Sequence, residues 1–249
     1  MLEIFPLKGF PIIKEEDNIT EMILNTLEKN TKSIEENDII VIAQSIISRV
    51  EKRIINLNDI EPSSFAKEIA EQSNKDPKLV EMILRESKNI CKNRNGVLIT
   101  ETKHGFVCAN SGIDKSNVPG ENTVSLLPIN PDKSAQKIRK DIKKRTKKDV
   151  AVIISDTHNR PFRMGAINIA IGCSGINPLK NYIEKIDLFG YKLKSSVTSD
   201  ADQLCSAAGL VMGEANEGFP VIIIRGYQYE KGEISAKTLI RPEERDYFR

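Results

Sequence analysis

The sequence predicts an α+β fold in which helices and strands are mixed along the chain without strict alternation. Apolar runs of small and β-branched residues, such as 38–43 and 150–155, are typical of buried strands. A longer segment at 132–147 has isoleucines at helical spacing, which indicates an amphipathic helix. Because these segments do not form a regular βα repeat, we expect mixed sheets with flanking helices rather than a doubly wound parallel sheet.

Capping residues and turn formers set the expected boundaries in the first half of the chain. One helix has a cap near Asn18 or Thr20, and Asp76 precedes a proline at the first position of another. Lys103-His104-Gly105 separates two short apolar runs, which predicts a hairpin. The elements expected in this half are strands at 2–7, 38–43, 97–102 and 106–110, and helices at 21–30, 63–72 and 77–89.

The second half of the chain follows the same reasoning. The lysines between 137 and 148 are expected on the solvated face of a surface helix, because Ile138 and Ile142 recur there at helical spacing. Gly190-Tyr191 predicts another hairpin. No domain boundary is evident, although the helical segment 60–95 is a candidate subdomain. The elements expected in this half are strands at 150–155 and 219–225, an apolar stretch at 167–173, and helices at 132–147 and 200–212.

The composition is that of an ordinary folded protein. Of the 249 residues, 29% are charged and 39% hydrophobic, and the net charge is +2. This length suffices for one large domain or two interlocked small ones. The small net charge does not indicate a nucleic acid partner, and no apolar stretch approaches membrane-spanning length. With no signal-like segment at the N-terminus, we expect a soluble cytoplasmic protein.

The cysteine pattern argues against a metal–thiolate site. Cys91, Cys108, Cys173 and Cys205 lie far apart and form no C-x-x-C pair. We therefore expect neither a zinc or iron–sulfur site nor a disulfide framework. All four lie in or beside apolar runs, where cysteine commonly acts as a small hydrophobic residue.

Three polar, acidic segments that adjoin apolar elements are the candidates for chemistry. They are Asp156-Thr157 after the 150–155 run, Asp114 within 110–117, and Glu214 within 212–219. Carboxylate and hydroxyl oxygens are hard ligands of the kind that magnesium and manganese prefer. If the three segments converge, they form a site for one or two divalent cations. The alternative is a turn or a helix cap, the commoner role of an Asp-Thr pair after a strand.

Paired hard cations beside arginine suit phosphoryl transfer. Arg160, Arg163 and Arg225 are available as partners of phosphate. The glycines of 213–218 lack the Lys-Ser/Thr pair of a Walker loop, the Rossmann pattern is absent, and no serine lies in G-x-S-x-G. His104 is expected at a hairpin tip and His158 in the loop after its strand.

Six segments together carry a more specific signal. They are FPLKGFPIIK (5–14), IAQSIISRVE (42–51), NSGIDKSNV (110–118), IISDTHNRPFR (153–163), LVMGE (210–214) and GFP (218–220). In this order they resemble the coenzyme F420-0:L-glutamate ligases, the gamma-glutamyl ligases of coenzyme F420 biosynthesis. The resemblance covers nearly the whole chain.

The resemblance implies a reaction in which GTP drives the addition of L-glutamate, through a γ-linkage, to coenzyme F420-0, a lactyl-phosphate-linked deazaflavin. The terminal carboxylate would become an acyl phosphate, which the glutamate amine attacks, and the addition can repeat. Two divalent cations, manganese or magnesium, and a monovalent cation such as potassium are implied. So are an α+β fold of two interlocked subdomains in an intertwined homodimer, and a single ligase domain over 1–249 without the C-terminal reductase domain of some bacterial relatives.

Carried over position by position, the resemblance implies Asp114 and Asp156 as metal-ligand aspartates and Thr157 and Glu214 as ligands of the second metal, with no catalytic side chain beyond these. Arg49 stands where the family usually has lysine, and Gln44-Ser45 where Ser-Thr is commoner, so the nucleotide geometry can differ. The positions implied to contact GTP are Phe10, Pro11, Ile12, Ile13, Gln44, Ser45, Arg49, Asn117, Met212, Gly213, Glu214, Ala215, Asn216, Glu217, Gly218 and Phe219.

Two other interpretations stay open from the residues alone. Another metal-dependent carboxylate–amine ligase, or an NTP hydrolase, would keep the metals and the nucleotide but change the acceptor. A nucleotide-binding regulatory module would use the acids only as caps and turns.

Overall fold

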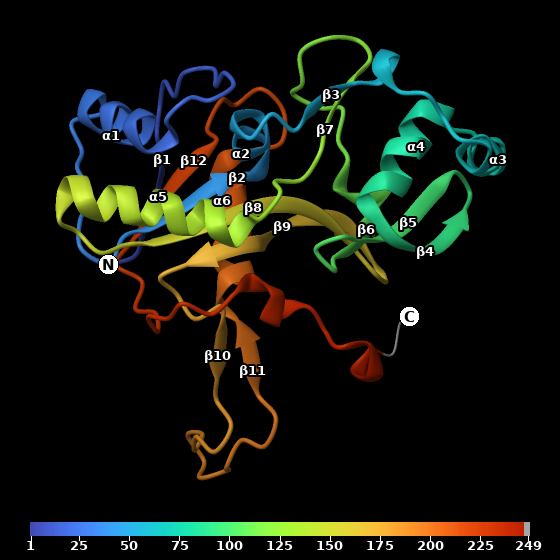
Figure 1. The fold of residues 1–249 in the computed structure, drawn as a ribbon. Coiled ribbons are helices and arrows are strands. Elements are labelled where there is room, and N and C mark those ends of the chain that lie inside the picture. The colour runs from blue at the N-terminus through green and yellow to red at the C-terminus, as the bar shows by residue number, and fades with distance from the viewer. Residues whose placement is uncertain (247–249) are drawn as a thin grey trace.

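The computed structural model describes residues 1–246, and its centre is a five-stranded mixed sheet (Figure 1). β2 and β8 are parallel neighbours, whereas the other three pairs of strands are antiparallel. This arrangement confirms the α+β class with mixed sheets. The strands, in their order across the sheet, are β1 (Glu3–Pro6), β12 (Val221–Arg225), β2 (Ile39–Ala43), β8 (Ala151–Arg160) and β9 (Arg163–Ser174).

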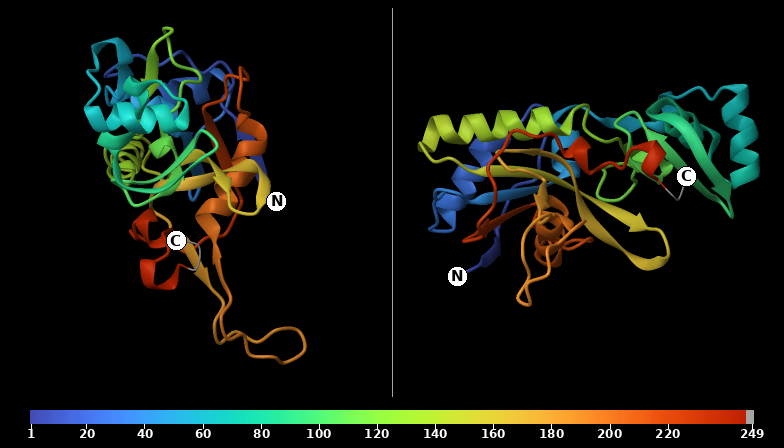
Figure 2. Two further views of the ribbon diagram at one scale, coloured as in Figure 1. Left: turned by 90° about the vertical axis from the view of Figure 1, so that its right-hand side faces the viewer. Right: turned by 90° about the horizontal axis from the view of Figure 1, so that it is seen from below.

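Helices cover both faces of this sheet because its central strands are apolar on both sides. Ile40 and Ile42 pack toward α1 (Ile19–Lys29), α2 (Gln44–Val50) and α5 (Pro131–Thr146). Ile39 and Val41 face the other way, toward α6 (Asp200–Met212). Successive side chains on a strand point to opposite faces, so a strand covered on both sides is apolar throughout. Figure 2 shows α5 and α6 on opposite sides of the sheet.

A smaller lobe with its own apolar core lies beside the sheet, at the right of Figure 1. Ile83 and Leu98 are fully buried there. Two short antiparallel strands, β3 (Ile54–Asn56) and β7 (Thr123–Ser125), carry the chain into the lobe and back. The elements of the lobe are η1 (Leu57–Asp59), α3 (Ser64–Ser73), α4 (Pro77–Glu86), β4 (Ser87–Arg94), β5 (Val97–Thr102), β6 (Val107–Ala109) and η2 (Asn110–Gly112).

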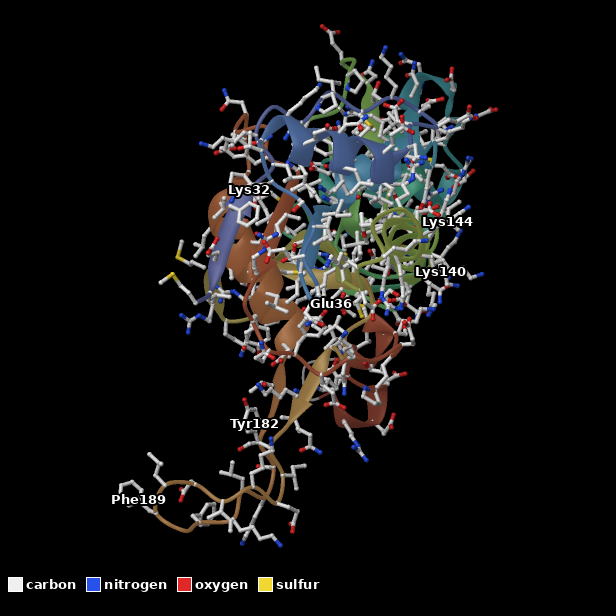
Figure 3. The ribbon with its side chains drawn as sticks, turned by 90° about the vertical axis from the view of Figure 1, so that its left-hand side faces the viewer. Lys32, Glu36, Lys140, Lys144, Tyr182 and Phe189 are labelled. Atoms are coloured by element: carbon white, nitrogen blue, oxygen red, sulfur yellow. The ribbon has the colours of Figure 1, made fainter. Side chains whose placement is uncertain are left out.

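A two-stranded ribbon projects from the body of the molecule, as Figures 1 and 3 show. It consists of β10 (Leu179–Asn181) and β11 (Val197–Ser199), joined by residues 182–196. We call residues 179–199 the arm. The predicted turn at Gly190-Tyr191 is confirmed, because the Asp187 N–H donates to the Tyr191 carbonyl at 2.9 Å. After β12, the chain returns through η3 (Ala236–Leu239) and η4 (Glu243–Arg245), and Ala236 is buried against the α6 face.

Several predicted details are confirmed. The Asn18 side chain caps α1 by accepting from the Glu21 N–H at 3.1 Å, which selects it over Thr20. On α5, Ile138 and Ile142 are buried and the lysines are exposed, and Figure 3 shows Lys140 and Lys144 on the outer surface. Within residues 1–246, no helix has the length and apolar character needed to cross a membrane.

Two predicted boundaries are wrong, each because pairing with a neighbouring strand overrides the local sequence. The helix at 77–89 ends at Glu86, and the polar segment that follows is β4, a strand held by pairing with β5. The strand predicted at 38–43 does end at Ala43, but α2, which begins at Gln44, was not predicted. The 150–155 strand continues to Arg160, because its polar half pairs with β9 through a two-residue turn at 161–162.

The cysteines divide between core and surface. Cys173 and Cys205 lie in the apolar core around α6, where burial raises the pKa of each thiol, that of Cys173 to about 12. Cys91, in contrast, is exposed on β4, which corrects the expectation that it is a small core residue.

Candidate functional site

A cavity of about 1110 Å³ lies at the carboxyl ends of the parallel strands β2 and β8. β2 ends at Ala43, opposite Ser155, whereas β8 continues for five more residues to Arg160. The residues of β8 beyond Ser155 therefore have no β2 neighbour, and the first four of them, 156–159, line the cavity. Ligands commonly bind beyond the carboxyl ends of parallel strands, and this volume is slightly above the roughly 300–1,000 Å³ typical of small-molecule sites.

The cavity brings together five segments that are far apart in the sequence. All the predicted site residues line it except Asn216. The N-terminal loop, the start of α2, the loop after β6, the extension of β8 and the loop after α6 each form part of its wall. The predicted residues on the wall are Phe10, Pro11, Ile12, Ile13, Gln44, Ser45, Arg49, Asp114, Asn117, Asp156, Thr157, Met212, Gly213, Glu214, Ala215, Glu217, Gly218 and Phe219.

Asp156 is paired with a histidine on its own strand. The His158 Nε2 lies 2.8 Å from the Asp156 Oδ2, which two residues on one face of a strand can achieve. His158 is buried, and its ring meets that of Phe106 edge-on, with centroids 6.2 Å apart. On the same side, burial and then the nearby Asp156 charge raise the pKa of the Cys108 thiol to about 12. Asp156 is therefore held from one side and faces the segment that contains β6.

Thr157 faces the opposite side of β8, toward α6. Its hydroxyl donates to the Glu214 Oε1 at 2.8 Å and accepts from the Asn168 Nδ2 at 3.3 Å. Asn168 is its register partner on β9, so the two side chains share a face of the hairpin. One lone pair of the Thr157 oxygen remains for a ligand. Thr157 and Glu214 thus present adjacent oxygen atoms to the cavity.

Asp114 lies on the wall formed by the loop after β6. Its Oδ1 accepts from the Ser116 N–H at 2.9 Å, and its Oδ2 accepts from the Ser116 hydroxyl. This is the Asx turn that the local sequence predicted as one role for this segment. Asp114 also has an exposed carboxylate on the cavity wall, so both roles are compatible with its position.

The backbone before Asp114 is strained. Asn110, Ser111 and Gly112 all have positive φ angles, of 52°, 55° and 69°. Non-glycine residues in this region cost about 1–2 kcal/mol each. The buried Ser111 fixes the turn to the lobe, because its Oγ lies 2.6 Å from that of Ser87 and 2.7 Å from the Thr100 Oγ1. Such strain is concentrated at binding sites, and this turn aims the 110–117 segment into the cavity.

The loop after α6 is organised by Glu217. Its carboxylate accepts from the Ala215 N–H at 2.8 Å, and backbone N–H donors lower the pKa of this exposed side chain. Gly213 has a φ of 73°, and a Cβ at this position would lie 2.2 Å from the Glu217 side chain. Glu217 therefore shapes the loop, whereas Glu214 reaches β8 and Thr157.

Arg49 and Lys14 are the cations on the described part of the cavity wall. The Arg49 guanidinium donates to the Asn117 carbonyl at 2.7 Å and to the Ile13 carbonyl at 3.4 Å. It therefore connects the N-terminal loop with the loop after β6, two walls that are far apart in the sequence. A planar fork with several donors suits this bridging position.

The three arginines that were expected to be available for phosphate do not line the cavity. β12 runs antiparallel to β2, so Arg225 lies at the amino end of β2, where it binds Asp38 and Glu35. Arg160 donates to the carbonyls of Met164 and Gly165 within its own hairpin. Arg163 is exposed in the same hairpin. The expectation for these residues is wrong because strand direction and hairpin pairing, which spacing does not reveal, decide where they lie.

The donor atoms of the cavity are chemically suited to hard cations but do not form a complete cage. Asp114, Asp156, Thr157 and Glu214 offer only oxygen atoms. Within residues 1–246, no three His, Cys, Asp or Glu side chains are grouped closely enough to hold a metal ion. Magnesium usually binds through one or two carboxylates, with waters and substrate phosphates completing its shell. The residues therefore fit cations that arrive with a phosphorylated ligand.

Two residues that belong to the site were not predicted from the sequence. His158 was predicted to lie in a loop, so its contact with Asp156 on the same face of a strand could not be predicted. Asn168 lies within an apolar stretch that was predicted only as such. A signal was present, because asparagine is unfavourable within strands and a polar residue between Ile167 and Ile169 needs a hydrogen-bonding partner.

Comparison with known proteins gives one consistent family. The model of the F420-0:gamma-glutamyl ligase family matches residues 9–226. Coenzyme F420:L-glutamate ligase of Methanocaldococcus jannaschii is 50% identical over 241 residues, 96% of this chain and 94% of the relative. The proteins of the same name from Methanothermobacter thermautotrophicus and Archaeoglobus fulgidus are 43% and 39% identical, over 100% of this chain and 99% and 96% of their own lengths.

Proposed function

The chain belongs to the F420-0:gamma-glutamyl ligase family, and we propose that it is a GTP-dependent coenzyme F420:L-glutamate ligase. The proposed substrates are coenzyme F420-0, L-glutamate and GTP, joined in a cytoplasmic step of coenzyme F420 biosynthesis. A γ-linked glutamate is added, and the product can accept further glutamates.

The observation that carries this proposal is that the five wall segments, which are far apart in the sequence, line one cavity. It contains the phosphate-compatible cations Arg49 and Lys14, the oxygen donors of β8 and its neighbours, and a volume of about 1110 Å³. A regulatory module that used its acids only as caps would not need Asp156 and Glu214 in the lining of one cavity.

The two faces of β8 suggest a division of roles. Asp156 on one face would hold a divalent cation together with Asp114, and Thr157 with Glu214 on the other face would hold the second. Their 2.8 Å hydrogen bond places the Thr157 and Glu214 oxygens close enough to serve one ion. When bound, the manganese or magnesium ions would neutralise the phosphates and hold them in line. Potassium is part of the proposal without an assigned residue.

The proposed chemistry proceeds in two displacements. The terminal carboxylate of the acceptor attacks the γ-phosphorus of GTP, the bond to the bridging oxygen breaks, and GDP leaves. The glutamate amine then attacks the carbonyl carbon of the acyl phosphate, the carbon–oxygen bond to phosphate breaks, and the nitrogen loses a proton. Phosphorylation is needed because a free carboxylate is a poor acyl donor. In this scheme the cavity walls orient the reactants, and the cations and Arg49 stabilise the charge that develops on the phosphates.

The test is incubation of the protein with F420-0, L-glutamate, GTP, manganese and potassium, followed by mass spectrometry. We expect successive glutamyl additions, one GDP and one phosphate released per addition, and no GTP turnover when acceptor or glutamate is omitted. With ¹⁸O in the acceptor carboxylate, one label should appear in the released phosphate. GTP hydrolysis at the same rate without acceptor would instead identify an NTP hydrolase, and an equal rate with ATP would contradict GTP dependence.

We also propose that the chain functions as one ligase domain, with 60–95 part of a subdomain, in an intertwined homodimer. The arm supports the dimer, because its outer half has large apolar side chains that the described protein does not cover. Leu188 is 98% exposed, Phe189 96% and Ile186 71%. Figure 3 shows Phe189 at the far end of the arm, away from the body. Exposed apolar groups of this kind mark protein–protein contacts, and the family resemblance selects a second copy as the partner.

A further inference from the structure

Asn168 is a buried polar residue on the edge strand of the central sheet, and the scheme above gives it no role. Its side chain is 8% exposed, and its Nδ2 donates to the Thr157 Oγ1. This bond uses one acceptor position of the hydroxyl and leaves its proton for Glu214. The rotation of the Thr157 hydroxyl is therefore fixed by Asn168 on one side and Glu214 on the other.

The backbone around Asn168 is bound to α6. The Asp202 Oδ1 accepts from the Ala170 N–H at 2.9 Å, and the Ser206 hydroxyl donates to the Asn168 carbonyl at 2.9 Å. Residues 202, 206 and 209 lie on one face of a helix, because they are spaced four and three apart. That face of α6 therefore covers the edge of β9.

Gly209 completes this contact by having no side chain. A Cβ at this position would lie 2.0 Å from the Asn168 Oδ1 and 2.7 Å from its Cγ. Glycine within a helix is unfavourable, and Gly209 adopts no positive φ that would require it. The space that it leaves is occupied by the Asn168 carboxamide, which a Cβ at this position would displace.

We propose that Asn168 is a positioning residue, held by Gly209, that orients the Thr157 hydroxyl beside Glu214 for binding of a divalent cation. This inference rests on the proposed function, because it assumes that Thr157 and Glu214 are cation ligands. Residues that orient metal ligands typically change affinity by about 10–100-fold when they are removed. Gly209 does not line the cavity. The three atoms nearest to an added Cβ at 209 all belong to Asn168, so a substitution there should affect Thr157 through Asn168.

The test is a cycle of Asn168→Ala, Gly209→Ala and the double variant, with Mn²⁺ affinity measured by electron paramagnetic resonance in the presence of a non-hydrolysable GTP analogue, and with the analogue and Mn²⁺ alone as the blank. We expect each single variant to weaken Mn²⁺ binding by about 10-fold or more. The double variant should be no weaker than Asn168→Ala, because an alanine at 209 then has no carboxamide to displace. Thermal unfolding checks that each variant is folded at the assay temperature, because displacing the buried Asn168 carboxamide offsets the gain that alanine gives the helix. Gln203→Ala, an exposed change on the same helix, should match the wild type in affinity.

Three results would overturn the inference. Wild-type affinity in Asn168→Ala would show that Thr157 needs no positioning, while the cation site itself would stand. A further loss from Gly209→Ala in the Asn168→Ala background, of the same size as in the wild type, would show that Gly209 acts by another route. Absence of Mn²⁺ binding to the wild type beyond that of the analogue alone would overturn both this inference and the proposed cation site.

Discussion

Asp156 and His158 lie on one face of β8 and have different roles there. Asp156 presents its carboxylate to the cavity, and His158, buried against Phe106, holds the Oδ2 from behind. The fixed orientation matters because a carboxylate that rotates freely loses part of its binding free energy to ordering.

Asp156→Asn tests whether Asp156 is a ligand of a divalent cation. The substitution keeps the shape but removes the charge that would hold a cation, so we expect glutamyl transfer to fall by at least about 100-fold. The rate of glutamyl addition is measured by mass spectrometry, and thermal unfolding checks the fold. Asp59→Asn, an exposed change in the lobe, should have the wild-type rate. Transfer at the wild-type rate in Asp156→Asn would refute the ligand assignment.

Arg49 bridges two walls of the cavity, which suggests a prediction about the loops. In Arg49→Lys the charge remains, but one ammonium nitrogen replaces two donors that bind the carbonyls of Ile13 and Asn117. We expect faster amide hydrogen exchange in residues 10–13 and 115–119, and GTP binding weaker by about 10-fold, since hydrogen bonds to a charged group contribute about 1.5–3 kcal/mol. Unchanged exchange in both segments would show that Arg49 does not link the loops.

At the scale of elements, α5 and β9 come into close contact. Gly172 on β9 lies under the first turn of α5, where a Cβ would be 2.4 Å from Pro131 atoms. The Asp132 carboxylate follows, accepting from the Cys173 N–H at 2.9 Å and the Ala236 N–H at 3.0 Å. The first turn of α5 thus joins the sheet to the returning C-terminal segment.

Gly172→Ala should therefore destabilise the fold. The added methyl group meets helix backbone that cannot rotate away, so we expect the free energy of unfolding to fall by about 1–3 kcal/mol, as in other overpacked sites. Denaturant unfolding followed by circular dichroism measures it. Gly232→Ala is the matched control, because the nearest atoms to its added Cβ are 3.4 Å away and no positive φ is involved. Equal stability of the two variants would contradict the close approach.

For the whole molecule, the arm decides the expected oligomeric state. Its end is apolar and remote from both cores, so it adds nothing to the stability of a single described chain. An exposed ribbon of this kind is marginal alone and becomes stable when a partner covers it.

Replacing the end of the arm should separate the proposed dimer. We expect Leu188→Ser with Phe189→Ser to shift the protein from dimer to monomer in light scattering coupled to size-exclusion chromatography, because the apolar area that drives association is lost. Lys194→Ser, an exposed polar change in the same loop, should leave the dimer intact. A wild-type monomer, or a double variant that stays dimeric, would contradict the role of the arm.

The sequence by itself determined the buried strands, most of the helices and their caps, because apolar periodicity and capping are local properties that each segment carries with it. It also supplied, through the family resemblance, the residues that the fold gathers around one cavity. Only the tertiary structure decided that β8 continues through Asp156 to Arg160, that Arg225 lies at the far end of the sheet, and that Asn168 binds Thr157. These features depend on which strands pair, in which direction and register, and pairing is set by contacts between residues far apart in the chain.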